Sequence, residues 1–159
     1  MKVYFAHPCF NEEQQQFKGE FLRRLLEATG NGIIIVDPFE YAANVEHSVE
    51  EKLRMSGRIK DACLELLREC QVLIALVDWN DTGTAFEAGY AHCLDLPIIL
   101  ISRTECASAN AMLIGAASAR YDNVQGEEQI GALAAALTEM ARTSSRLTTQ
   151  DDDEGKPPQ

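Results

Sequence analysis

The sequence has few of the features that mark secreted, zinc-binding or nucleic-acid-binding proteins. Its five cysteines are scattered, with no CxxC pair and no histidine at zinc-ligand spacing. This pattern favours reduced thiols in a cytoplasmic protein over a disulfide framework. Positive charge is scarce too, because 14 Lys and Arg residues are outnumbered by 25 Asp and Glu, for a net charge of -11. That balance argues against a nucleic acid polymer or an anionic membrane surface as a partner.

Long apolar runs are also missing. No segment approaches the roughly 20 apolar residues that span a bilayer, and the apolar start of the chain is too short for a signal peptide. We therefore expect a soluble protein. Its 159 residues, 46% of them hydrophobic, suffice for one globular domain. We predict that this domain spans residues 1–142 and that residues 143–159, which include an acidic run and a Pro-rich end, form a disordered tail.

Predicted strands and helices alternate along the domain. Strands are expected at 2–6, 33–36, 72–77 and 98–101, with a weak fifth at 119–121, and helices at 11–29, 48–69, 84–95, 110–117 and 127–142. The β-branched run at 33–36 is typical of a strand buried on both faces. Such alternation predicts an α/β fold with a doubly wound, five-stranded parallel sheet in three α/β/α layers. A flavodoxin-like strand order is expected, with the switch point between the first and third strands.

The stretch from Val77 to Ala91 places two carboxylates where a strand passes into a helix. Asp81 lies on the turn and Glu87 about one helical turn later. Ligands of open α/β sheets bind at this end of the strands, and two carboxylates there can divide nucleophilic and proton-transfer roles. Gly83 would let the turn approach a ligand closely.

Each of these residues also has a purely structural interpretation. Thr84 and Glu87 have the spacing of a capping box, in which Glu87 would only satisfy backbone donors. Asp81 could be a turn former, Tyr4 a core residue of the first strand, and Asn110 the N-cap of a short helix.

Three patches resemble the nucleoside 2-deoxyribosyltransferase family. They are Val3-Tyr4-Phe5-Ala6-His7-Pro8-Cys9-Phe10, Asp81-Thr82-Gly83-Thr84-Ala85-Phe86-Glu87-Ala88-Gly89-Tyr90-Ala91 and Asn110-Ala111-Met112. The resemblance extends over roughly residues 2–140. It implies transfer of 2-deoxyribose between nucleobases in nucleotide salvage, with nucleosides and free nucleobases as the partners and with no metal or cofactor.

The same resemblance implies a role for each matching residue. Glu87 would attack the anomeric carbon and form a covalent glycosyl intermediate, Asp81 would bind the base and manage its proton, and Tyr4 would hydrogen-bond the nucleophile. Breaking an N-glycosidic bond leaves positive charge on the sugar, which an ionised carboxylate can trap, while the departing base needs a proton.

Substrate contacts are implied as well. Asn110 would reach across a homo-oligomer interface, in a dimer or a larger assembly, to hold the sugar of a neighbouring site. Met112 would lie beside it, and Phe10 and Gly83 would line the substrate cleft.

One position departs from the family pattern. The family carries an aspartate on the helix before the third strand, and aligning that helix places Cys63 there. Asp61 is two residues away, about 200° around the helix axis, so either the helix slips and Asp61 contacts the base, or this contact is missing. The alternatives to a transferase are a nucleoside or nucleoside-monophosphate N-glycosidase of the same fold and a nucleotide-binding module without chemistry.

Overall fold

A computed structural model describes residues 1–42, 49–104 and 109–151. Five parallel strands form one sheet in the order β2-β1-β3-β4-β5, which confirms the predicted doubly wound, flavodoxin-like arrangement. Its strands are β1 (Lys2–Ala6), β2 (Ile34–Val36), β3 (Val72–Leu76), β4 (Ile98–Ile101) and β5 (Ala119–Tyr121). The chain reverses its direction of winding between β1 and β3, where Tyr4 lies in register with Leu73. Ligands are therefore expected at the carboxyl ends of these two strands.

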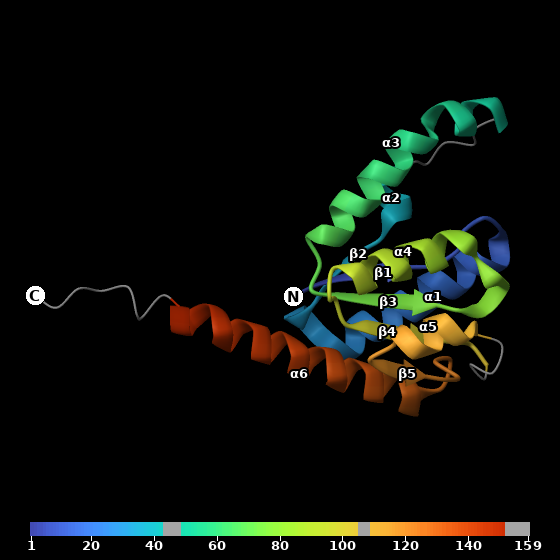
Figure 1. Cartoon of the computed structure of the whole chain (residues 1–159). Coiled ribbons are helices and arrows are strands. Elements are labelled where there is room, and N and C mark those ends of the chain that lie inside the picture. Colours follow the sequence, from blue (N-terminus) through green and yellow to red (C-terminus); the bar gives the residue numbers. More distant parts are fainter. Residues whose placement is uncertain (43–48, 105–108, 152–159) are drawn as a thin grey trace, which may run out of the picture.

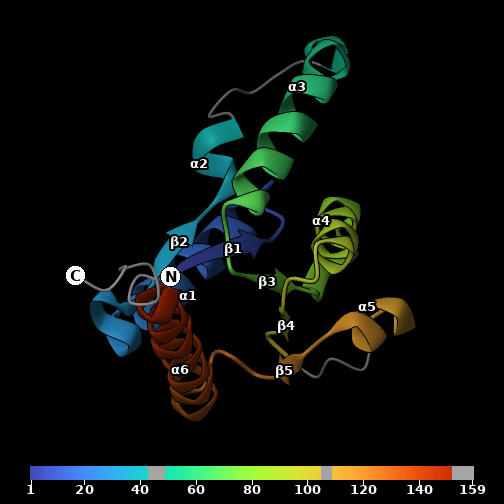
Figure 2. The same cartoon turned by 60° about the vertical axis from the view of Figure 1, so that its left-hand side comes forward.

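Helices cover both faces of the sheet and complete three layers (Figure 2). They are α1 (Glu12–Thr29), α2 (Pro38–Ala42), α3 (Val49–Arg68), α4 (Thr82–Cys93), α5 (Ala111–Ala116) and α6 (Glu127–Asp151), with short 3-10 turns η1 (Gly30–Gly32) and η2 (Asp78–Asn80). One core cluster joins the sheet to α1 and α6, and the other joins it to α3, α4 and α5. None of the described helices is long and apolar enough to cross a membrane.

Strand β1 divides its side chains between these two clusters. Val3 and Phe5 belong to the cluster under α1 and α6, whereas Tyr4 and Ala6 belong to the one under α3 and α4. All four are fully buried, because successive side chains of a central strand point to opposite covered faces. Tyr4 therefore carries its hydroxyl toward α3 and α4, where a buried phenol needs a hydrogen-bond partner.

Two predicted core positions are wrong. Ile34 is 60% exposed, since β2 is an edge strand with a neighbour on one side only, and burial on both faces was predicted. Leu53 lies on the apolar side of the helix predicted at 48–69, the side expected to face the sheet, but it is 73% exposed. Figure 1 shows the reason: α3 rises away from the sheet, and only its C-terminal half lies over the body.

Several helix boundaries differ from the prediction. Residues 38–42 are helical where an irregular segment was expected, with Pro38 at the first position, which suits proline. Helix α3 passes through Gly57 without a break. Helix α6 continues to Asp151 rather than ending at Arg142. No glycine or proline occurs between Arg142 and Gly155 to end it earlier. Residues 152–159 of the predicted tail lie outside the described residues.

Candidate active site

Tyr4 and Glu87 meet at the switch point of the sheet. The Tyr4 hydroxyl, carried by β1, donates a hydrogen bond of 2.6 Å to Oε1 of Glu87 on α4. The tyrosine is completely buried, so its position is fixed by the core around it. Because Oε1 is occupied, the second carboxylate oxygen of Glu87 is the one left for chemistry.

The surroundings of this pair favour its neutral forms. Burial raises the pKa of Glu87 to about 7; the hydrogen bond from Tyr4 opposes this shift, and the negative charges of Asp81 and Asp37 add to it. Burial and the Glu87 charge raise the pKa of the Tyr4 hydroxyl well above its usual range. Tyr4 is therefore a permanent donor, and Glu87 changes its charge near neutral pH.

Asp81 is the N-cap of α4. Its Oδ2 accepts hydrogen bonds from the backbone N–H of Thr84 at 2.7 Å and from the Thr84 hydroxyl at 2.9 Å. The predicted capping box between Thr84 and Glu87 is therefore wrong, because Asp81 occupies the capping position and Glu87 is bonded to Tyr4. Both capping bonds go to Oδ2 of Asp81, and neither uses Oδ1.

Gly83 makes room for this carboxylate. A Cβ atom at position 83 would lie 3.1 Å from Oδ2 of Asp81, a distance tighter than ordinary van der Waals contact. The glycine therefore protects the orientation of Asp81 rather than providing only an open approach to the turn. A glycine on a helix, such as Gly89, would be expected to allow close helix packing, but a Cβ at that position would meet nothing within 4 Å.

Asn110 and Asp81 line the same small cavity, of about 140 Å³, between the turn after β3 and helix α5. The Asn110 side chain caps α5 by accepting the Met112 N–H at 2.8 Å, which is the structural role predicted as the alternative. Met112 itself is 84% exposed, and Phe10 is 68% exposed. The Phe10 ring lies edge-on to Phe39 at 5.5 Å, at the end of β1.

On α3, it is Cys63 rather than Asp61 that faces the central pair. Burial and the Glu87 charge raise the pKa of the Cys63 thiol, and a hydrogen bond with Tyr4 opposes the shift. Asp61 points elsewhere: its side chain is 64% exposed and pairs with Lys60 at 2.7 Å. The helix is regular through both positions, so a thiol lies where the family pattern has a carboxylate.

The turn before Asp81 has an unusual backbone. Trp79 and Asn80 both have positive φ, of 66° and 46°, a left-handed conformation that asparagine tolerates and a bulky aromatic residue rarely adopts. The Trp79 ring is held edge-on against Phe17 and under the Arg103 guanidinium. Asp78, which opens the turn, accepts the backbone N–H of Arg103 at 2.8 Å. Contacts from α1 and from the loop after β4 thus hold the turn that carries Asp81.

Sequence reasoning missed a buried charge cluster beside this site. Asp37, at the end of β2, accepts a hydrogen bond from Lys18 on α1 at 2.9 Å and lies 3.2 Å from the His7 ring. It also accepts the backbone N–H of Phe39 at 2.9 Å. His7 and Asp37 are only 3% and 2% exposed. An acid followed by proline at a strand end was the available signal, and it was interpreted only as the end of the strand.

Asp37 keeps its negative charge within this cluster. Burial alone would raise the pKa of Asp37, but hydrogen bonds from His7 and Lys18 outweigh it and lower that pKa to about 2. The other ring nitrogen of His7 lies 3.1 Å from the Pro8 carbonyl. Both ring nitrogens of His7 therefore lie near oxygen atoms of neighbouring groups.

The arrangement suits nucleophilic attack at one carbon and proton management at a nearby atom. Glu87 offers one oxygen near its titration point, and Asp81 offers one oriented oxygen. Within the described residues, no three side chains of metal-ligating type come together.

The sequence profile of the nucleoside 2-deoxyribosyltransferase family matches residues 3–150. The chain belongs to this family. The match includes Tyr4, Asp81, Glu87 and Asn110, the positions on which the resemblance was first noted. No curated protein sequence matches the chain significantly.

Solved structures show the same fold. A 2-deoxyribosyltransferase from Bacillus psychrosaccharolyticus has a TM-score of 0.63 and 24% identity, over 79% of this chain and 88% of that one. A CMP N-glycosidase from Clostridium botulinum has a TM-score of 0.53 and 16% identity, over 84% and 97%. A conserved protein from Enterococcus faecalis has a TM-score of 0.52 and 20% identity, over 91% and 98%. At these identities the likeness establishes the architecture alone.

Proposed function

We propose that the protein is a nucleoside 2-deoxyribosyltransferase that works by two displacements at the anomeric carbon. The observation that carries this proposal is the 2.6 Å hydrogen bond from Tyr4 to Glu87 at the switch point. It fixes one oxygen of the carboxylate, so the attack on the sugar falls to the other oxygen. Family membership supports the substrate class, which is nucleosides and free nucleobases.

In the first displacement the free oxygen of Glu87 forms a bond to the anomeric carbon as the bond from that carbon to the base nitrogen breaks. The departing base takes a proton or a strong hydrogen bond from the Asp81 side. In the second, the nitrogen of another base attacks the same carbon and gives its proton to the Asp81 side, and the Glu87 carboxylate leaves as an anion. Ionised Glu87 is required at the start, so its pKa of about 7 sets the acid limb of activity.

The remaining predicted residues complete the substrate site in this proposal. Phe10 lines the base end together with Phe39, and Asn110 and Met112 hold the sugar. The exposure of Met112 supports a homo-oligomer in which α5 reaches a neighbouring site. We place the activity in nucleoside salvage in the cytoplasm, and Asp61 has no part in it because its carboxylate pairs with Lys60.

A hydrolase is the second candidate, and Cys63 is the observation that favours it. With a thiol in place of the family carboxylate, one contact to the acceptor base is lost, so water competes better for the glycosyl group. The similar fold of a CMP N-glycosidase is compatible with this outcome.

One assay separates the two candidates. The protein is incubated with a deoxynucleoside and a second free base, and the products are resolved by chromatography. A new nucleoside identifies the transferase, and free deoxyribose with one released base identifies the hydrolase. If neither product forms with any purine or pyrimidine deoxynucleoside or its monophosphate, both the transferase and the hydrolase are refuted.

A further inference from the structure

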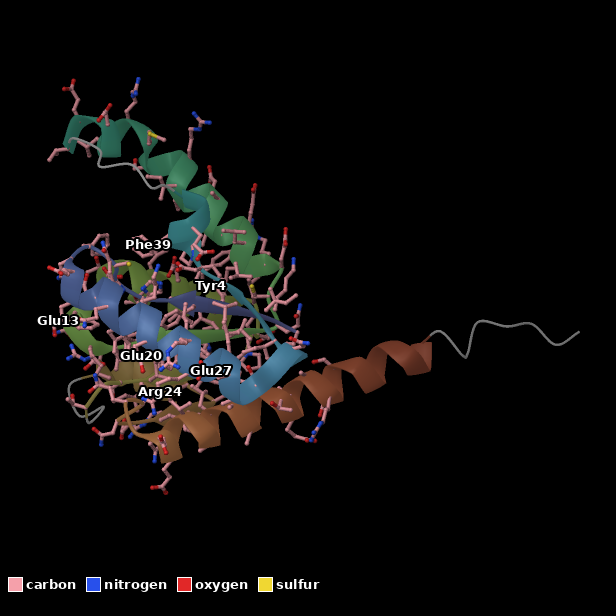
Figure 3. All side chains as sticks on the ribbon, turned by 180° about the vertical axis from the view of Figure 1, so that it is seen from behind. Tyr4, Glu13, Glu20, Arg24, Glu27 and Phe39 are labelled. Carbon is pink, nitrogen blue, oxygen red and sulfur yellow. The ribbon has the colours of Figure 1, made fainter. Side chains whose placement is uncertain are left out.

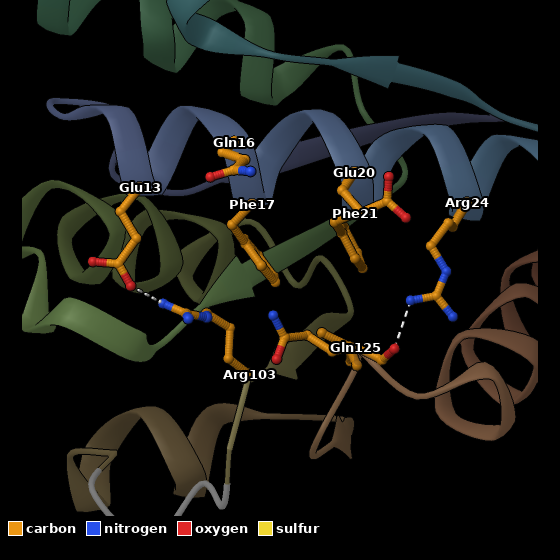
Figure 4. A pocket seen from close by; sticks show the side chains of 9 residues that line it. Glu13, Gln16, Phe17, Glu20, Phe21, Arg24, Arg103 and Gln125 are labelled. Atoms are coloured by element: carbon orange, nitrogen blue, oxygen red, sulfur yellow. Dashed lines mark hydrogen bonds and ion pairs between the residues drawn. The ribbon is translucent and has the colours of Figure 1, made fainter.

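A second and larger cavity lies on the α1 side of the sheet, away from Glu87. Its volume is about 440 Å³, which falls within the range of roughly 300–1,000 Å³ found for small-molecule sites. Figure 4 shows it under α1, with Arg103 at one end, Arg24 at the other and Phe17 and Phe21 between them. Seen from behind, the labelled Glu13, Glu20 and Arg24 lie along the same helix (Figure 3).

The guanidinium of Arg103 is held in place but incompletely bonded. It lies 4.8 Å over the Trp79 ring and 5.6 Å over the Phe17 ring, and its Nη1 donates to Glu13 at 2.6 Å. Its Nε is buried and has no hydrogen-bond partner in the part of the chain that the structure describes. Such a buried donor is uncommon. Because solvent does not reach Nε, a phosphate or carboxylate in the cavity would bond to the terminal nitrogens of the guanidinium.

The rest of the cavity suits a flat heteroaromatic group. The rings of Phe17 and Phe21 are stacked, 5.8 Å apart and inclined by 11°. The two residues line the cavity with 8% and 2% of their surface exposed. Gln16 and Gln125 line the walls, and each amide can both donate and accept hydrogen bonds. Arg24 closes the far end through a 2.6 Å bond to the Gln125 carbonyl.

We propose that this cavity binds a mononucleotide, with its phosphate at Arg103 and its base against Phe17 and Phe21. Glu13 does not block the phosphate, because its side chain is 62% exposed and an exposed ion pair separates at small cost. Glu20 is already paired with Arg23 at 2.7 Å. The chain as a whole carries a net charge of -11, which repels anions. The guanidinium groups at the two ends of this cavity provide local positive charge that can attract one.

A ligand bound in this cavity would also affect the turn that carries Asp81. The same Arg103 whose side chain would take the phosphate donates its backbone N–H to Asp78 at 2.8 Å, and its guanidinium covers Trp79. These two residues open the turn that leads to Asp81. The bound nucleotide would thus act as an effector of the Glu87 site, whichever reaction that site carries out.

Trp79 provides the measurement, because it is the only tryptophan in the chain. Fluorescence is recorded while AMP or CMP is added to the full-length protein, with adenosine and inorganic phosphate as the two half-ligands. We expect a saturable change with a mononucleotide and at least roughly tenfold weaker binding of either half-ligand, since each lacks one set of contacts. Equal binding of inorganic phosphate and AMP would show an anion site without a base subsite and overturn the proposal.

Variants then locate the bound nucleotide by equilibrium dialysis with labelled AMP. Arg103→Gln should weaken binding by roughly tenfold or more and Arg24→Gln by about threefold to tenfold, as expected when charged hydrogen bonds to phosphate or base are lost. Arg142→Gln removes the same charge from an exposed position, 66% accessible and paired with Glu139, and should bind as the parent does.

Glu87→Ala should also bind AMP normally, because the cavity is separate from the catalytic cleft. Binding that Glu87→Ala abolishes while Arg103→Gln and Arg24→Gln preserve it would place the nucleotide in the cleft and refute the proposal. So would the absence of saturable binding to the folded parent. Each of these results leaves the test of the proposed reaction untouched, since no turnover is measured.

Discussion

Two carboxylates at the same edge of the sheet have opposite electrostatic fates. Asp37, after β2, has its pKa lowered to about 2, whereas Glu87, on α4, has its pKa raised to about 7. Burial pushes both pKa values upward. The difference comes from their neighbours, because Asp37 receives hydrogen bonds from Lys18 and His7 and Glu87 receives one from a neutral phenol, with other carboxylates nearby.

This contrast separates a structural charge from a reactive one. An anion that is hydrogen-bonded to Lys18 and His7 is too stable to serve as a nucleophile, and it ties β2, α1 and the end of β1 together. A carboxylate that titrates near neutral pH has a free oxygen and little stabilisation to lose on reacting. The experiments below test this distinction from the largest expected effect to the smallest.

Glu87→Gln should lower kcat/KM for base exchange or release by roughly 10⁴-fold or more, as expected for removal of a nucleophile. The amide oxygen can still accept the Tyr4 hydrogen bond, so circular dichroism should show an unchanged fold. If chromatography finds substantial turnover in this variant, the nucleophile is another group.

Asp37→Asn should lower the free energy of unfolding at pH 7 by about 3–5 kcal/mol, because Lys18 and His7 lose a buried anionic partner. The folded pKa of about 2 lies below the ordinary value of 3.8. The stabilisation is therefore complete above about pH 4 and is lost as the pH falls toward 2.

Urea unfolding at pH 7 and pH 3 measures this effect, with Asp61→Ala as the matched loss of an exposed acid. We expect the difference in free energy of unfolding between the parent and Asp37→Asn to be smaller at pH 3 than at pH 7. An equal difference at both pH values would mean that Asp37 contributes by packing instead of charge.

The pH dependence of stability should have the opposite sign at Glu87. Its folded pKa of about 7 lies above the ordinary value of 4.5, so the stability it contributes is present below pH 4.5 and is lost as the pH rises through 7. Glu87→Gln should therefore be more stable than the parent at pH 8, by up to roughly 3 kcal/mol, and much less so at pH 4.5. Thermal melts of the parent and Glu87→Gln at pH 4.5 and pH 8 measure these differences in stability. An equal difference at both pH values would show that the pKa of Glu87 is not raised.

Tyr4→Phe should reduce kcat/KM by roughly 10- to 100-fold, the cost of one hydrogen bond to a charged group. Because the hydroxyl opposes the upward shift in the pKa of Glu87, its removal should raise that pKa further. The acid limb of the pH–rate profile should move to higher pH. A uniform loss at every pH would indicate that Tyr4 acts only through packing.

The smallest effects are expected on α3. Cys63→Asp places a second negative charge beside Glu87, so the acid limb should rise by roughly one pH unit or less. Asp61→Ala should change neither the position of the acid limb of the pH–rate profile nor kcat/KM, since the Asp61 carboxylate is exposed and paired with Lys60. A large loss in Asp61→Ala would show that α3 slips when substrate binds.

Local patterns in the sequence predicted the sheet order and the stretch from Asp81 to Glu87. The strand-turn-helix pattern around these acids depends on neighbours a few residues apart, although the helix begins at Thr82, two residues before the predicted start. The Asp37 cluster was not predictable in the same way. Lys18 and His7 are 19 and 30 residues from Asp37, and nothing in the local sequence at any of the three specifies the others.

The misjudged positions have a similar cause. The exposure of Ile34 depends on β2 lying at the sheet edge, and the identity of a residue carries no information about strand order. The left-handed conformation of Trp79 could not be expected from its type, because such a backbone is disfavoured for an aromatic residue. In both cases tertiary contacts overrode a local preference.

The unfavourable backbone of Trp79 has a consequence for how the protein folds. A conformation that costs on the order of 1–3 kcal/mol becomes stable only after Phe17 of α1 and Arg103 beyond β4 are in place to hold the indole. These contacts join residues 62 positions before Trp79 and 24 after it. We expect the turn to be among the last parts of the chain to order, so that Asp81 takes up its position only in a molecule whose sheet is already complete.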